Sequence, residues 1–512
     1  MNIQQDNVLH SRNGKFDDGT TSHPSDVARI LDEALKSAPD KGLVIHFHGG
    51  LNSEESGRNI ANDLYQPYHD AGAYPLFFVW ESGLVESLIN NPKDILADPA
   101  FRELVKKVAE WVAKKLGGQV GTKGSSGQAI NEVQLRRDFD LWFNGEAAEP
   151  PITNEGKVAT TFTTKGVALN EDELVNEIQF GLDGDPDFQK AIQQLHNAVV
   201  GGHVTTKGSG TTAVAPVVLV SGYALGRLFP DTTATTKGAL VWFKVATFVA
   251  EIIIKVIKRF ATGRDHGVYC TIVEEVLRAA YLDFVGSTIW NQMKKDTVDS
   301  FGNDPQCCGT AVVKQLGTLH AAGKNFNKIT LIGHSTGALY ICEFLDAAAQ
   351  YAPELKFDII FLAPAVRHDR FASTLKIHYN QDNRIVHFRM FCMMDKVESD
   401  DVLIPILYIR SLLYFVSGLL EGHVDHAGAW IADIDAPILG MERYISNKRV
   451  YDSTSFPQIA EVRTDLQIIA NSKVWSVTSN AGNGLSSTSK KHGDFDNDKI
   501  TLDSIIYLIK NW

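Results

Sequence analysis

A short apolar run that leads into a pair of glycines constrains the fold of this chain most strongly. Residues 329–332 have the composition of a buried strand, GHSTG follows at 333–337, and a helical apolar pattern covers 336–350. Glycines on both sides of a serine leave room for a sharp strand-to-helix turn that larger residues would block. The segment therefore predicts a strand, a strained turn with Ser335 at its apex, and a helix.

Runs of strand length with helical segments between them recur at both ends of the chain. The predicted strands cover residues 43–47, 76–80, 329–332, 357–362, 386–393 and 474–477. Helical patterns precede the first strand, separate the first two at about 59–68, and recur at about 457–470 and 501–510. Strands linked by helical crossovers are typical of parallel sheets. We expect an α/β fold with a doubly wound, mostly parallel sheet.

The middle of the chain has a different texture, which predicts a large insertion. Helical periods there alternate with stretches rich in Gly, Thr and Ser, at 117–127, 153–166 and 201–213. We expect residues 20–100 and 325–512 to build the α/β core. Residues 101–324 are then a mainly helical insertion, or cap, over the carboxyl edge of the sheet, where such sheets hold their ligands.

Two long apolar segments raise the question of membrane contact. Residues 239–260 are strongly apolar, but five charged side chains fall on one helical stripe. This favours an amphipathic helix in the cap or packed on the core, and leaves a helix resting on lipid and a spanning helix as alternatives. Residues 402–420 contain Pro405, Arg410 and Gly418, which disfavours a straight spanning helix. We hypothesise that the two segments line an apolar acyl pocket or form a lid.

Composition and charge exclude several classes of partner and compartment. The formal net charge of −12 argues against general affinity for nucleic acid or anionic membranes. Five cysteines, two of them adjacent, suggest no disulfide framework. The sequence begins without an apolar signal-like stretch. We expect a cytoplasmic protein, and the sequence leaves the oligomeric state open.

The serine turn needs a base and an acid if its hydroxyl is to act as a nucleophile. His492 lies in a polar loop between the last predicted strand and the last helix, and is the candidate base. Asp395 directly follows the strand at 386–393 and is the candidate acid, with Asp400 and Asp401 as alternatives. The acids at 494, 496 and 498 are interpreted as loop solvation or a helix cap.

An oxyanion hole needs two backbone N–H groups near the serine. Thr336 follows Ser335 directly and supplies one of them. The turn His48-Gly49-Gly50-Leu51 follows an early strand, and Gly50 is the candidate second donor because glycine lets the main chain approach a reacting carbonyl, with Leu51 as the alternative.

With these residues in the order Gly50, Ser335, Asp395, His492, the chain resembles the α/β-hydrolase superfamily in its lipase and esterase-like branch. The resemblance covers about residues 40–100 and 325–512. It implies a nucleophile elbow, a catalytic triad and a serine esterase that cleaves a small-molecule or lipid acyl substrate without metal or organic cofactor. Thioesterase, amidase, peptidase and acyltransferase activities would use the same triad.

Two competing interpretations come from other classes. A metal hydrolase is suggested by His46 with His48 and by His423 with His426, although these fragments lack further ligands at suitable spacing. A non-catalytic binding module on the same fold is the second alternative, because a fold does not guarantee chemistry.

Overall fold

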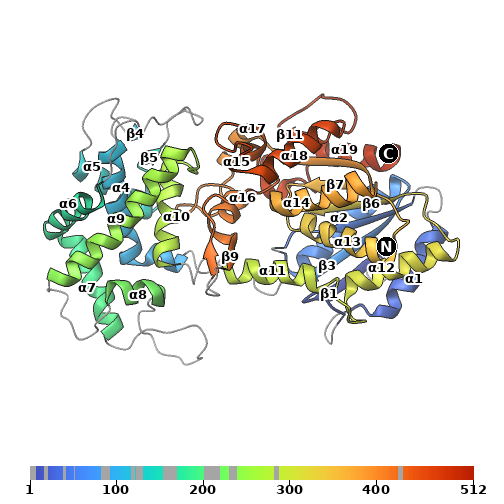
Figure 1. Ribbon diagram of the computed structural model, residues 1–512, viewed down its shortest axis with the longest axis horizontal. Coiled ribbons are helices and arrows are strands. Elements are labelled where there is room, and N and C mark those ends of the chain that lie inside the picture. Colours follow the sequence, from blue (N-terminus) through green and yellow to red (C-terminus); the bar gives the residue numbers. More distant parts are fainter. Residues whose placement is uncertain are drawn as a thin grey trace.

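The computed structural model shows two lobes joined by a narrower middle region (Figure 1). One lobe is an α/β core, and the other consists of helices from the middle of the sequence. The structure describes residues 7–16, 21–37, 42–50, 52–81, 93–116, 121–122, 131–153, 170–200, 220–229, 239–281, 287–424 and 430–512.

A parallel sheet forms the centre of the α/β core. In the described part of the chain it has seven strands in the order β1-β3-β2-β6-β7-β8-β11, and every neighbouring pair is parallel. The strands are β1 Val8–Arg12, β2 Leu43–Phe47, β3 Tyr74–Glu81, β6 Ile329–His334, β7 Phe357–Leu362, β8 Ile385–Met393 and β11 Lys473–Ser476. The prediction of an α/β fold with a mostly parallel sheet is confirmed.

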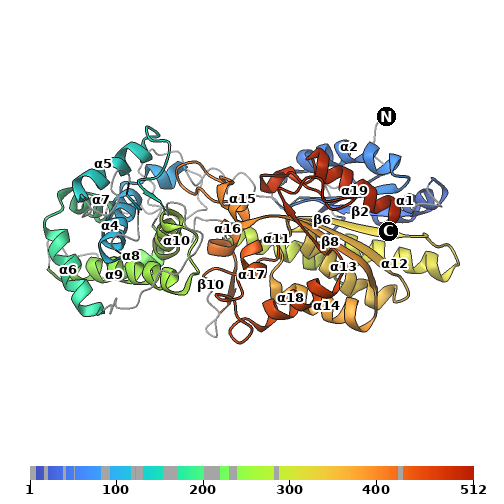
Figure 2. The ribbon, with the colours of Figure 1, turned by 90° about the horizontal axis from the view of Figure 1, so that it is seen from above.

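Helices cover both faces of this sheet because successive side chains of each strand point to opposite faces. One face packs against α2 Glu54–Asp70 and α19 Lys499–Asn511. The opposite face packs against helices on the other side of the sheet (Figure 2). These are α1 Pro24–Ser37, α11 Ser287–Asp299, α12 Cys308–Ala321, α13 Gly337–Tyr351, α14 His368–Leu375 and α18 Pro457–Ile468.

The helical lobe is built around one long helix, α9 Ala239–Thr262, which is the apolar segment identified in the sequence. It packs against α4, α6, α8 and α10, so most of its described apolar side chains are buried inside the lobe, with Phe243 near its beginning exposed. The lobe comprises α4 Pro99–Leu116, α5 Glu132–Phe143, α6 Glu171–Asp183, α7 Pro186–Val200, α8 Gly222–Leu228, α10 Val268–Ala280 and the short strands β4 Gly121–Thr122 and β5 Ile152–Thr153. Within the described ranges, no helix combines the length and apolar character needed to cross a membrane.

The middle region contains the second apolar segment and the chain that follows it. Residues 402–420 form a loop, the short helix α16 Leu412–Phe415 and a π-helical turn at Val416–Leu420 that contacts both α10 and α11. This region also holds α15 Asp395–Asp400, β9 Gly422–Val424, β10 Trp430–Ala432 and α17 Glu442–Ser446.

The structure divides the chain differently from the sequence interpretation at two points. The strand β1, at Val8–Arg12, belongs to the sheet although it precedes residue 20. Helices α11 and α12 pack against α13 on the core, although they were expected in the insertion. Helix α9 lies on the far side of α10 from the sheet, so the hypothesis that it lines an acyl pocket finds no support in its position (Figures 1 and 2).

Candidate functional site

Ser335 occupies the sharp turn that joins β6 to α13. Its φ angle is +54°, in the left-handed region that residues other than glycine seldom adopt. Its N–H donates to the carbonyl of Leu362, and its own carbonyl accepts from the N–H of Ala365. A Cβ at Gly333 or Gly337 would come within 2.7 Å or 2.2 Å of backbone atoms, so both positions require glycine. The strained serine turn expected from the sequence is present.

The glycine turn after β2 lies directly against the serine turn. A Cβ at Gly49 would be 3.3 Å from the Cβ of Ser335, and a Cβ at Gly50 would be 2.6 Å from Oγ1 of Thr336. The Thr336 side chain is buried and makes no hydrogen bond within the described structure. The two segments expected to supply the oxyanion hole, at Gly50 and Thr336, are therefore in contact. Leu51, the alternative donor, lies outside the described residues.

His48 fixes the shape of this glycine turn. Its Nε2 accepts from the backbone N–H of Trp80 at 3.2 Å, so its Nδ1 carries the proton and donates to the carbonyl of Gly49 at 2.7 Å. The His48 ring also stacks on the Trp80 indole with 5.8 Å between centroids. Burial lowers the pKa of His48 to about 4, which keeps the ring neutral and preserves this tautomer.

His492 lies in a 3₁₀ turn, His492–Asp494, after the last strand and before α19. Its side chain is buried, and among the described residues neither ring nitrogen has a hydrogen-bond partner. Burial, reinforced by the neighbouring His334, lowers the pKa of His492 to about 3. The ring is therefore a neutral imidazole with both nitrogens unoccupied, and it makes no hydrogen bond to Ser335 in this structure.

A buried ion pair connects the serine turn to the histidine loop. His334 is the last residue of β6, and its Nδ1 donates to Asp496 at 3.2 Å while its Nε2 donates to the carbonyl of His492 at 2.9 Å. Burial alone would lower the pKa of His334, but the Asp496 carboxylate and the His492 carbonyl together outweigh burial and raise that pKa. The rings of His334 and His492 lie 5.4 Å apart between centroids.

The three candidate acids after β8 occupy different environments. Asp395 is half-buried, and its carboxylate accepts the hydroxyl of Tyr414 at 2.6 Å. Asp400 ends α15 and is exposed. Asp401 accepts the backbone N–H of His492 at 2.9 Å, and burial raises the pKa of its carboxyl. Of these three, Asp401 is the one that the structure joins to the histidine loop.

Asp496 is the site residue that sequence reasoning assigned to another role. Acids at 494, 496 and 498 were interpreted as solvation or capping, and Asp498 does cap α19 by accepting from the N–H of Thr501. Asp496 is instead buried against His334. A signal was present in the sequence, because His334 ends a buried strand and needs a polar partner, but the sequence does not specify which residue provides it.

The histidines proposed as metal ligands have other partners. His46 shares a hydrogen bond of 3.2 Å with the hydroxyl of Tyr68, and both ring nitrogens of His48 are engaged as described above. His423 pairs with Asp433 at 2.8 Å, and His426 lies outside the described residues. In the described ranges no three His, Cys, Asp or Glu side chains are grouped as metal ligands.

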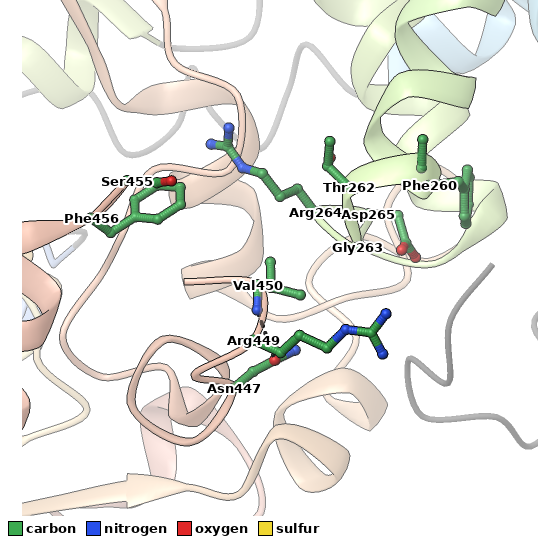
Figure 3. A pocket seen from close by; sticks show the side chains of 11 residues that line it. Phe260, Thr262, Gly263, Arg264, Asp265, Asn447, Arg449, Val450, Ser455 and Phe456 are labelled. Carbon is green, nitrogen blue, oxygen red and sulfur yellow. Dashed lines mark hydrogen bonds between the residues drawn. The ribbon is translucent and has the colours of Figure 1, made fainter. Parts of the chain in front are cut away.

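A cleft of about 480 Å³ lies where the end of α9 faces the chain after α17 (Figure 3), and neither Ser335 nor His492 lines it. Residues from the end of α9 and the loop after it, including Arg264, form one wall. The opposite wall comes from the chain after α17, including Arg449 and Phe456. Arg264 is held by the Asp435 carboxylate at 3.0 Å, so one of the two arginines already has an anionic partner.

No protein-family model, curated protein or solved structure matches this chain.

Proposed function

We propose that the protein is a serine hydrolase of the α/β-hydrolase type that cleaves a carboxylic ester. The observation that carries the proposal is the strained backbone of Ser335, at the carboxyl end of a central parallel strand and in contact with a glycine turn. Strain of this kind costs free energy and persists where the surrounding structure enforces it, which is common at reactive sites. The neutral, buried His492 on the adjoining loop supplies a base.

The proposed reaction is a two-step acyl transfer. Ser335 attacks the substrate carbonyl while His492 accepts its proton, and the N–H groups of Gly50 and Thr336 stabilise the oxyanion. The protonated imidazole then gives its proton to the leaving group, and water releases the acyl group from Ser335. Helix α13 begins at Gly337, so its amino-terminal dipole favours negative charge beside the turn.

The proposal requires one local movement. The His492 ring must turn or shift so that one nitrogen reaches the Ser335 hydroxyl, since no such hydrogen bond exists in this structure. Hydrogen bonds of this kind often form only when substrate binds. The triad also needs an acid beside His492, and two residues are candidates for it. Asp395 was the sequence candidate, and Asp401 has the direct contact with the loop.

We propose a small-molecule or lipid acyl ester as substrate, with no metal, organic cofactor or nucleic acid involved. Thioesterase, amidase and acyltransferase activities use the same groups, and the acyl and leaving groups distinguish them. All five cysteines are buried free thiols, which supports the proposal of a reducing compartment such as the cytoplasm.

A non-catalytic binding module is the second candidate. It is favoured by one observation, that both ring nitrogens of the buried His492 lack partners within the described structure. A catalytic histidine is normally oriented by an acid on its ring, so an unoriented ring is also what a protein that has lost the chemistry would show.

Hydrolysis of p-nitrophenyl esters with acyl chains of increasing length tests the proposal. We expect turnover by the wild type, its loss in Ser335→Ala and His492→Ala, and its retention in the control Ser373→Ala, which changes an exposed serine on α14. Matched thioester and anilide substrates separate the alternative activities. Absence of turnover and of serine labelling in folded wild-type protein would favour the binding module.

A further inference from the structure

We infer that His334 and Asp496 are a positioning pair that holds the main chain of His492 in place beside Ser335. The inference rests on the proposed function, because it assigns the part of the site that controls where the base lies. It concerns neither the nucleophile nor the oxyanion hole.

The geometry links nucleophile and base through one side chain. His334 and Ser335 are adjacent in the chain, so contacts that hold the end of β6 in place hold both residues. The His334 ring spans from Asp496 at 3.2 Å to the carbonyl of His492 at 2.9 Å. The His334 side chain thereby connects the loop that carries the base to the strand that carries the nucleophile, and His334 is itself part of the GHSTG sequence.

Strand alternation explains why His334 points to this loop. Residues 330, 332 and 334 share one face of β6, and Ile332 belongs to the apolar cluster formed with α2 and α19. The 3₁₀ turn at His492–Asp494 leads directly into α19 on that same face. The His334 side chain therefore contacts this loop at the carboxyl end of β6.

The pair is buried, and its charges compensate one another. His334 and Asp496 expose 6% and 8% of their surfaces. Burial opposes ionisation of Asp496, but His334 outweighs this effect and lowers the pKa of that carboxyl. A protonated His334 has two N–H donors, and the geometry uses both. A neutral ring would have to give up one of the two contacts.

Other titratable groups surround the pair on several elements. His46 and His48 face it from β2 and the following turn, and Tyr68 faces it from α2. The remaining groups are His492 itself, in the loop before α19, and Asp401, in the loop after α15. Burial lowers the pKa of His46 to about 3, so that ring adds no charge, and the charged groups around His492 are the His334 cation and the carboxylates of Asp496 and Asp401.

Substitutions that separate the charge of His334 from its donor test the pair. His334→Leu removes both, His334→Gln keeps a donor without the charge, and Asp496→Asn removes the counterion. We expect His334→Leu to slow fluorophosphonate labelling of Ser335 by about 10²-fold, because a misplacement of about 1 Å carries such a penalty. We expect His334→Gln to recover part of that rate.

The pH profile of labelling separates positioning from general structural damage. In His334→Gln the cation beside His492 is gone and Asp496 remains, so the acid limb of the profile shifts to higher pH. In addition, hydrogen exchange of peptides covering 488–496 should accelerate in His334→Leu, which reports on the loop without any reaction.

The paired change His334→Leu with Asp496→Leu guards against a single variant that fails to fold, because replacing both members of a buried ion pair costs far less than removing one. His387→Leu is the matched control, since His387 pairs with Asp358 at 2.8 Å near the amino ends of β7 and β8. It should leave labelling and the 488–496 peptides unchanged.

The inference is overturned if folded His334→Leu or the double variant labels at the wild-type rate with unchanged exchange at 488–496. Failure of the proposed function looks different. The wild type would then not label at all, while faster exchange in His334→Leu would still establish the tie between His334 and the loop.

Discussion

Replacing Gly50 by alanine probes the contact between the glycine turn and the serine turn. The added methyl would lie 2.6 Å from Oγ1 of Thr336, 2.9 Å from Sδ of Met293 and 3.0 Å from Cη2 of Trp80. All three neighbours are buried, so none can move into solvent. Overpacking of this kind costs about 1–3 kcal/mol of stability. Relief of the clash moves Gly50 away from Thr336, and loss of one oxyanion donor slows acyl transfer by about 10²–10³-fold.

The assay pairs two measurements on the purified variant. Thermal unfolding reports the stability loss, and the second-order rate of fluorophosphonate labelling reports the site. Gly226→Ala in α8 is the control, because a Cβ there has no heavy atom within 4 Å, and it should not slow labelling. Wild-type stability together with wild-type labelling in Gly50→Ala would refute the reasoning, since it would mean that the two turns do not approach as closely as the structure shows.

Three further predictions concern stability. Thr336→Val removes a buried hydroxyl that makes no hydrogen bond in the described structure. The free energy of unfolding, measured by denaturant titration, should therefore stay unchanged or rise by up to about 1 kcal/mol. A fall of more than about 1 kcal/mol would show that the hydroxyl has a hydrogen-bond partner. Burial raises the pKa of Glu398 to about 8 from 4.5, so the folded carboxyl keeps its proton where the unfolded one ionises. Stability should therefore fall between about pH 4.5 and pH 8, by roughly 5 kcal/mol in full, and Glu398→Gln should remove this slope in unfolding measured across that range. Asp435→Asn removes the charge of a buried carboxylate that accepts hydrogen bonds from Arg264, His266 and Tyr444 where the two lobes meet. The free energy of unfolding in chemical denaturation should fall by about 3–5 kcal/mol. A fall of less than about 1 kcal/mol would show that the contact between the lobes does not depend on this charge.

The strands of the sheet were predictable because buried parallel strands are apolar on both faces. The runs at 43–47 and 357–362 coincide with β2 and β7, and the run at 329–332 lies within β6. The edge strand β1 was missed because VLHSR is short and half polar, and its pairing with β3 depends on a register that only the fold reveals. Helix α12 was assigned to the insertion because its apolar pattern does not indicate which surface it covers.

The candidate site was predictable only where its signal is local. Ser335 is marked by two glycines within a strand-to-helix context, and the structure places it at φ +54°. The contacts that hold the His492 loop are long-range, because the His492 backbone binds Asp401 and His334, and His334 in turn pairs with Asp496, and a sequence does not show which distant residues meet. Asp395 was chosen for its position at the end of β8, but its side-chain contact with Tyr414 could not be inferred from position alone.

Mapping the residue modified by a fluorophosphonate probe shows whether Ser335 is the nucleophile. The folded wild-type protein is treated with the probe, digested, and analysed by mass spectrometry for the peptide spanning 329–350. We expect a single phosphonylated serine, Ser335, whose modification disappears in His492→Ala. Modification of a different residue, or none in folded protein at high probe concentration, would contradict it.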